Sequence, residues 1–123
     1  NSRSCPYVLI VCISARRAVE LLKELKPLKV RVAKLFPKNG SIAEQNEQLA
    51  KNSYSIAIGT PHRLRQVNLD LSNTQLVIVD CHVSHKQYTV CTLPDTAPHC
   101  MGLIRDVVLP QVCKRKDCKL AFL

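Results

Sequence analysis

A chain of 123 residues is long enough for one domain with a buried core, and 46% of these residues are apolar. Only 4% are aromatic, which predicts an aliphatic core, and no apolar run reaches the ~20 residues that a membrane-spanning helix requires. The net charge of +9 lies mostly in residues 1–66, which favours an anionic partner such as RNA, DNA or an acidic protein surface; simple solubility is the alternative.

The chain contains seven cysteines, an odd number, and none of them forms a Cys-x-x-Cys pair. A disulfide framework is therefore not expected, and reduced thiols in a cytosolic or nuclear protein are the better interpretation. Cys12 stands inside an apolar run and is predicted to be a small buried side chain. That run, residues 7–13, is too short to predict a signal peptide.

The hydrophobic pattern predicts strands that alternate with helices. Strands are predicted at residues 7–13, 30–36, 54–58, 75–80 and 118–123. Helices are predicted from the N-cap Ser14 to Pro27, over 41–52, from Pro61 to about Val67 and over 100–113, with an irregular connection at 81–99. This order predicts a single α/β domain over residues 1–123, with three layers and a mostly parallel sheet covered by helices on both faces.

Basic residues stand at three helix starts, where the partial positive charge of the helix end disfavours cations by up to ~1 kcal/mol each. In a parallel sheet these starts share one edge, at which ligands usually bind. We therefore predict a row of phosphate sites for the backbone of a nucleic-acid strand, formed by Ser14, Arg16, Arg17, Lys38, Thr60 and Arg63. Alternatively, the arginines are solvated or pair with Glu20 and other nearby acids.

The motifs of nucleotide hydrolysis are absent from these residues. The three glycines, Gly40, Gly59 and Gly102, do not have the spacing of a P-loop. Asp80 ends a predicted strand, as a magnesium-binding aspartate does, but Cys81 follows it and a lone carboxylate cannot organise phosphoryl transfer. We interpret Asp80 as a turn cap. The cysteines and histidines of residues 81–100 match no common zinc pattern, so neither a metal nor a cofactor is predicted.

Five ordered blocks carry a resemblance to a known family: SARRA (14–18), KLFPKN (34–39) followed by Glu44-Gln45, GTPHRL (59–64), VIVD (77–80) and KLAFL (119–123). Together they resemble the Cms family of eukaryotic proteins of small-ribosomal-subunit biogenesis, which belong to the processome. More distantly, the chain is similar to the first RecA-like domain of DEAD-box RNA helicases. The resemblance covers nearly the whole chain.

The resemblance implies a non-catalytic RNA-binding or scaffold factor rather than an enzyme. Arg16, Thr60 and Arg63 would correspond to helicase contacts with the RNA backbone, and Asp80 to a degenerate ATP-site position. The implied partners are pre-rRNA or small nucleolar RNA and pre-ribosomal assembly proteins, in the nucleus and nucleolus, with no membrane. The P-loop strand region would be missing upstream of this RecA-like domain.

Two alternatives remain open at this point. The first is a protein–protein interaction scaffold with the same degenerate helicase fold, in which residues 81–99 would be the contact element. The second is a helicase-type ATPase whose P-loop lies upstream of residue 1.

Overall fold

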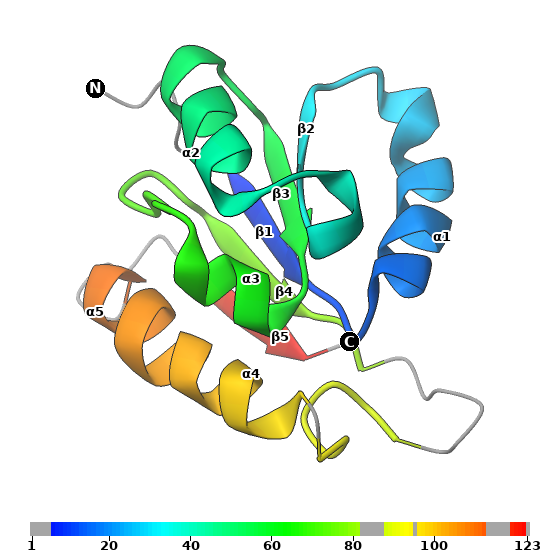
Figure 1. The fold of residues 1–123 in the computed structure, drawn as a ribbon, viewed down its shortest axis with the longest axis vertical. Helices are drawn as coiled ribbons and strands as arrows, with labels where there is room; N and C mark the ends of the chain where they lie inside the picture. The colour runs from blue at the N-terminus through cyan, green and yellow to red at the C-terminus, as the bar shows by residue number, and fades with distance from the viewer. Residues whose placement is uncertain (1–5, 82–87, 95, 113–118, 123) are drawn as a thin grey trace.

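The computed structural model of the chain describes residues 6–81, 88–94, 96–112 and 119–122. Its strands form one sheet in the order β2-β3-β1-β4-β5, and every neighbouring pair is parallel (Figure 1). The strands are β1 (Val8–Val11), β2 (Val32–Leu35), β3 (Ile56–Gly59), β4 (Leu76–Val79) and β5 (Lys119–Phe122). Each lies within or one residue beyond a predicted range, so the predicted parallel α/β sheet is confirmed.

The connecting helices are α1 (Ala15–Leu25), α2 (Ile42–Lys51), α3 (Pro61–Gln66), α4 (Ala97–Leu103) and α5 (Leu109–Val112), with short 3-10 turns η1 (Lys26–Leu28) and η2 (Pro37–Asn39). Between α4 and α5 lies a π-helical segment, η3 (Ile104–Val108). The final helical region begins at Ala97 rather than at residue 100, since Pro98 suits a first helical turn. Pro110 is tolerated after the wide π turn, in which the amide of Leu109 binds the carbonyl of Ile104.

The first two helices begin at the predicted residues because serine side chains cap them. The Ser14 hydroxyl accepts a hydrogen bond from the amide of Arg17. Ser41 and Glu44 form a reciprocal capping box at the start of α2. Both caps satisfy amide groups that the helix itself leaves without partners, and so they fix where each helix leaves the sheet edge.

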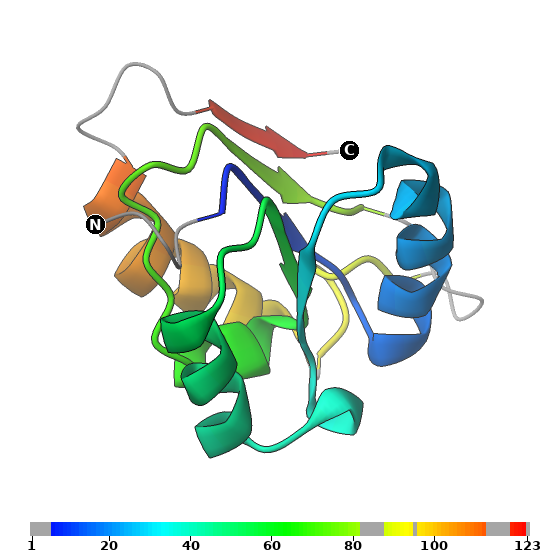
Figure 2. The same ribbon diagram turned by 90° about the horizontal axis from the view of Figure 1, so that it is seen from above.

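The sheet lies between two helical layers of unequal size (Figure 2). The chain crosses from β1 over β3 to the edge strand β2, and every later crossover runs the other way. Because parallel crossovers are right-handed, this reversal places α1 alone on one face and α2, α3 and α4 on the other. The larger core lies under α2, α3 and α4, and a smaller one, including Ile10, Ile58 and the predicted buried Cys12, lies under α1.

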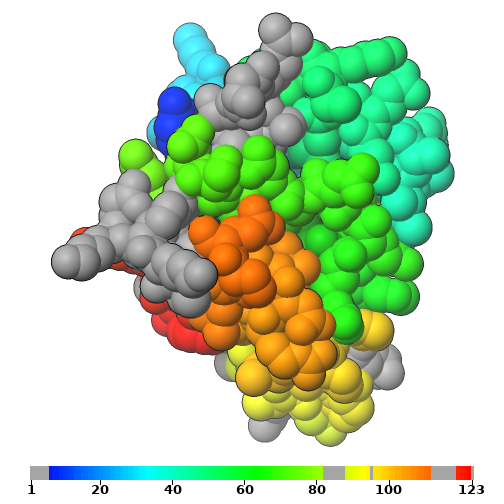
Figure 3. Space-filling view, turned by 90° about the vertical axis from the view of Figure 1, so that its left-hand side faces the viewer, coloured from blue at the N-terminus to red at the C-terminus, as the bar shows by residue number. Residues whose placement is uncertain are grey.

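On the larger face, α3 and α4 pack against one another, and α2 lies beside α3 in the surface view (Figure 3). The prediction that residues 81–99 form an irregular connection falls partly on residues 82–87 and 95, which lie outside the described residues. The described turn residues of this stretch, Tyr88–Leu93, lead into α4. No helix in the described parts of the chain has both the length and the apolar character needed to cross a membrane.

Candidate nucleic-acid interface

The residues predicted to bind nucleic acid lie along one edge of the sheet. Lys38 follows β2, Thr60 follows β3, Ser14 follows β1 and Asp80 follows β4. Because these strands are parallel neighbours in the order β2-β3-β1-β4, the four segments are adjacent at the carboxyl-terminal edge in that same order. The structure thus brings together segments that are up to 66 positions apart in the chain.

Arg17 does not extend into solvent but binds the strand-end aspartate. Its Nε donates to Asp80 Oδ2 at 2.8 Å and its Nη2 to Asp80 Oδ1 at 3.3 Å, while Nη1 lies 3.3 Å from Glu20 Oε1. The two side chains of the main pair are 22% and 10% exposed. The Asp80 carboxylate, hydrogen-bonded to the guanidinium, raises the pKa of Arg17. A bidentate ion pair thus joins the start of α1 to the end of β4.

This pair determines what the Asp80 carboxylate can do. Both of its oxygens accept hydrogen bonds from Arg17, and its negative charge is balanced by a guanidinium that is always protonated. A cation at these oxygens would lie next to the Arg17 guanidinium, whose positive charge opposes its binding. These contacts therefore make Asp80 the partner of an arginine, in a position where a P-loop enzyme would hold magnesium.

Arg63 is also directed into the domain. Its Nη1 donates to the carbonyl of Gly40 at 2.7 Å and to Gln45 Oε1 at 2.9 Å. Gln45 is fully buried, and its amide donates to the carbonyls of Lys34 and Phe36. Arg63 and Gln45 together therefore hold the segment from β2 to α2 against α3, and this segment includes Lys38. Hydrogen-bonded networks of this kind fix a local conformation, although the Nε of Arg63 is buried here without a hydrogen-bond partner.

Thr60 and Cys12 complete the central part of the edge. Thr60 is the N-cap residue of α3, with extended backbone angles and without a side-chain cap hydrogen bond. The Cys12 thiol donates to the carbonyl of Gly59 at 3.4 Å. Burial, with a smaller contribution from the Asp80 charge, raises the pKa of the Cys12 thiol to about 12. Cys12 is therefore a packing residue rather than a nucleophile.

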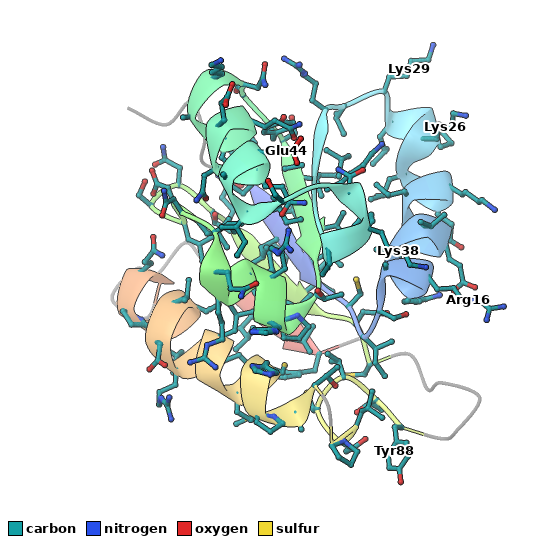
Figure 4. The ribbon with its side chains drawn as sticks, in the orientation of Figure 1. Arg16, Lys26, Lys29, Lys38, Glu44 and Tyr88 are labelled. Carbon is teal, nitrogen blue, oxygen red and sulfur yellow. The ribbon has the colours of Figure 1, made fainter. Side chains whose placement is uncertain are left out.

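Arg16 and Lys38 differ from Arg17 and Arg63, which are half-buried and bound within the domain. Arg16 and Lys38 are both exposed, and they line a groove of about 490 Å³ between the first turns of α1 and the η2 turn. Figure 4 shows the two side chains on the same side of the molecule, one from each element. We call this the strand-end groove and define it by all of its lining residues: Ala15, Arg16, Val19, Glu20, Lys23, Phe36 and Lys38.

The charge of the strand-end groove is predominantly positive. Among the described residues, its cations Arg16, Lys23 and Lys38 take part in no ion pair, whereas its single acid, Glu20, is bound by Arg17. Arg17 thus neutralises the carboxylates next to the groove without itself entering it. The arrangement leaves three exposed cations around a concave surface next to a helix N-terminus, which suits a phosphate-bearing ligand.

The sequence analysis named two of these three cations and missed Lys23. A signal was present, because Arg16 and Lys23 are seven residues apart and therefore share one face of α1. Phe36, whose burial closes the floor of the groove, could not be assigned to this site without knowing that β2 lies next to η2 and α1.

The cysteine and histidine residues of the 81–100 stretch provide no metal site among the described residues, in which no group of three or more potential ligands converges. Cys91 and Cys100 approach with their sulfur atoms 4.0 Å apart, and His99 stacks on His62 with ring centroids separated by 4.1 Å. His82 and His85 lie outside the described residues.

The fold and the site define a parallel α/β domain whose strand-end edge is basic. At this edge, the aspartate that follows β4 is paired with an arginine of α1. The whole chain, residues 1–123, matches the model of the CMS1 family, described as "U3-containing 90S pre-ribosomal complex subunit", and the chain belongs to this family. The resemblance of the sequence to the Cms family is thereby confirmed.

The curated relatives agree with this assignment. Protein CMSS1 of Danio rerio is 31% identical over 126 residues, which cover 97% of this chain and 43% of the relative. Protein CMS1 of Chaetomium thermophilum is 31% identical over 99 residues, covering 74% of this chain and 39% of the relative. Protein cms1 of Schizosaccharomyces pombe is 35% identical over 83 residues, which cover 63% of this chain and 30% of the relative. The chain spans less than half the length of these relatives.

Proposed function

We propose that this chain is a non-catalytic RNA-binding factor of pre-ribosomal particles of the small subunit, working in the nucleus and nucleolus. Membership of a family described as a 90S pre-ribosomal complex subunit supports the setting. The observation that carries the RNA contact is the strand-end groove, in which Arg16, Lys23 and Lys38 have no described ion-pair partner. Pre-rRNA or a small nucleolar RNA is the proposed ligand.

The contact is made with the sugar–phosphate backbone rather than with bases. The groove has one aromatic lining residue, Phe36, and this side chain is only 4% exposed, so it offers no open ring for stacking. Three flexible cations close to the capped start of α1 match neighbouring phosphates of a single strand. Binding of this type carries little sequence specificity and depends strongly on salt.

The remaining predicted residues serve this site indirectly. Ser14 and the Arg17–Asp80 pair fix the start of α1, from which Arg16 projects. Arg63 holds the carbonyl of Gly40, at the end of the turn that carries Lys38. Arg17 and Arg63 are thus positioning residues in this proposal. The residues that touch RNA are Arg16, Lys23 and Lys38.

The Arg17–Asp80 pair also supports the non-catalytic part of the proposal. An ATPase of the helicase type requires the strand-end carboxylate to bind magnesium, and here that carboxylate is held by two hydrogen bonds from a guanidinium. The alternative of an ATPase completed by an upstream P-loop requires this pair to open. It therefore predicts that Mg²⁺ stabilises the wild-type protein through Asp80, which thermal scans with and without MgCl2 measure.

The RNA contact is tested by the affinity of the protein for a single-stranded RNA of about 15 nucleotides, measured across a salt series. Three phosphate contacts predict a slope of log K against log salt of roughly −2. In Arg16→Glu/Lys38→Glu the magnitude of this slope should fall to less than about 1. The control is Lys51→Glu/Arg105→Glu, which makes the same charge change on α2 and η3. Equal RNA binding by the two double variants would refute the proposal.

A further inference from the structure

A second groove lies between the same helix and the edge strand, towards the opposite end of α1. It has a volume of about 800 Å³ and runs between the α1–η1 segment and β2. We call it the α1–β2 groove. Figure 4 shows its Lys26 and Lys29 near the end of α1 that is remote from Arg16. It touches the strand-end groove, with which it shares Val19, Lys23 and Phe36.

Cations surround the α1–β2 groove and no acid lines it. The basic lining residues are Lys23, Lys26, Lys29, Arg31 and Lys34. Within the described part of the chain, none of these five forms an ion pair. Concentrated like charge of this kind destabilises an isolated domain through self-repulsion, and this cost is relieved when an anionic partner binds. The groove is therefore suited to a ligand with several negative charges.

The floor of the groove is aliphatic. Its apolar lining is Val19, Leu22, Leu25, Val30, Val32 and Phe36. Val19 and Val30 are 44% and 40% exposed, so part of this apolar surface is in contact with water in the free domain. A phosphate backbone gains nothing from covering aliphatic side chains, whereas leucine or isoleucine side chains of a polypeptide do. The preferred ligand therefore carries both negatively charged groups and aliphatic side chains.

The two aromatic side chains of the groove are not open to nucleic-acid bases. Phe36 is 4% exposed, and the ring of Tyr54 is covered by the Arg31 guanidinium at 5.7 Å from its centroid. Single-stranded RNA gains much of its affinity from stacking on exposed rings, which this surface does not present. The strand-end groove also lacks an open ring, so the feature that favours a peptide over an RNA strand here is the aliphatic floor with its exposed Val30.

We propose that the α1–β2 groove is a docking site for an acidic segment of a partner protein that carries bulky aliphatic side chains. The aliphatic side chains pack on Val19, Val30 and Leu22, and flanking carboxylates lie against Lys26, Lys29 and Lys34. Recognition of an amphipathic segment by a groove with an apolar floor and charged rim is a common mode of peptide binding. The two grooves share Val19, Lys23 and Phe36, but this proposal does not rest on the RNA contact at the strand-end groove and would stand if that contact were refuted.

Selection from a displayed library of random peptides of about 16 residues, performed on the protein, provides the test. The enriched peptides are expected to combine aspartate or glutamate with leucine, isoleucine or valine. Synthetic copies of these peptides should lose affinity about tenfold with Lys26→Glu/Lys29→Glu and about fivefold with Val30→Ser, while Lys51→Glu/Arg105→Glu and Arg16→Ala/Lys38→Ala change it less than about twofold. Circular dichroism checks that each variant remains folded.

Three results would overturn the proposal. One is that no peptide is enriched, or that the enriched peptides lack acidic residues. Another is that acidic peptides bind equally well to Lys26→Glu/Lys29→Glu and to the control. The third is that a single-stranded RNA of about 15 nucleotides competes for the groove, with Lys26→Glu/Lys29→Glu abolishing RNA binding and Val30→Ser leaving it unchanged, which would make the groove an RNA site.

Discussion

Removing Arg17 or Asp80 tests whether these two residues form a structural pair rather than remnants of an ATP site. Their side chains are 22% and 10% exposed, so the pair lies between a surface salt bridge, worth 0–1 kcal/mol, and a buried one, whose disruption costs ~3–5 kcal/mol. With two hydrogen bonds to one carboxylate, a coupling of about 2 kcal/mol is expected.

The two single variants should not be equivalent. Arg17→Ala leaves the Asp80 carboxylate, at 10% exposure, without its guanidinium and should cost about 3 kcal/mol. Asp80→Ala should cost about 2 kcal/mol, because Arg17 keeps its contact with Glu20 and can reach water. The double variant should be about as stable as Arg17→Ala alone, so that the coupling energy is about 2 kcal/mol.

Urea unfolding of the four proteins measures this coupling, and each 1 kcal/mol should correspond to roughly 4 °C in Tm. Thermal scans with and without MgCl2 add a functional readout, since the Arg17 guanidinium opposes the binding of a second cation to the Asp80 carboxylate. A coupling within 0.5 kcal/mol of zero, as additive variants show, contradicts the reasoning. So does stabilisation of the wild-type protein by Mg²⁺ that Asp80→Ala abolishes.

Three further predictions concern packing, thiol chemistry and pH. Gly59→Ala should destabilise the domain by about 3 kcal/mol in urea unfolding, because a Cβ there would overlap a backbone carbonyl of β2; unchanged stability would contradict the packing. Burial raises the pKa of both Cys12 and Cys100 to about 12, so mass-spectrometric mapping should find both protected from iodoacetamide at pH 8 until urea is added. Burial, with the charge of stacked His99, lowers the pKa of His62, so stability should fall as pH drops below 6.5, and His62→Gln should flatten this dependence.

The strands and the first three helices could be predicted because local signals determine them. The β-branched run at β1, the Ser14 cap and the Thr60-Pro61 start each specify an element without reference to the rest of the chain. The last helical region was less accessible. Its start depends on Pro98 and its continuation past Pro110 on a π turn, which an analysis of apolar periodicity does not detect.

The basic edge of the sheet could be located from the sequence, but the different roles of its residues could not be separated. Cations at helix starts indicated an anionic partner at this edge, because such positions are otherwise unfavourable, and for Arg16 and Lys38 this stays a prediction. For Arg17 the anion is Asp80, a residue 63 positions away that becomes a neighbour only because β4 pairs with β1. The strand order follows from long-range packing, so the sequence could not separate Arg17, which is internally paired, from Arg16, which is exposed.

The same limit applies to Arg63 and Gln45. They belong to two separate sequence blocks, yet in the structure the Nη1 of Arg63 donates a hydrogen bond to the Oε1 of Gln45 at 2.9 Å. Burial of Gln45 was consistent with its place on the apolar stripe of α2, but its role as acceptor for an arginine required the packing of α2 beside α3. Polar residues on an apolar stripe are useful signals of such networks.

Cross-linking by ultraviolet light, followed by mass spectrometry of the RNA-linked peptides, tests the central claim most directly when it is applied to the protein within pre-ribosomal particles. The account predicts RNA adducts on peptides from the first turns of α1 and from the η2 turn, the segments that carry Arg16 and Lys38. Adducts should disappear from both in Arg16→Glu/Lys38→Glu and persist in Lys51→Glu/Arg105→Glu. RNA adducts confined to other segments, or unchanged in Arg16→Glu/Lys38→Glu, would contradict it.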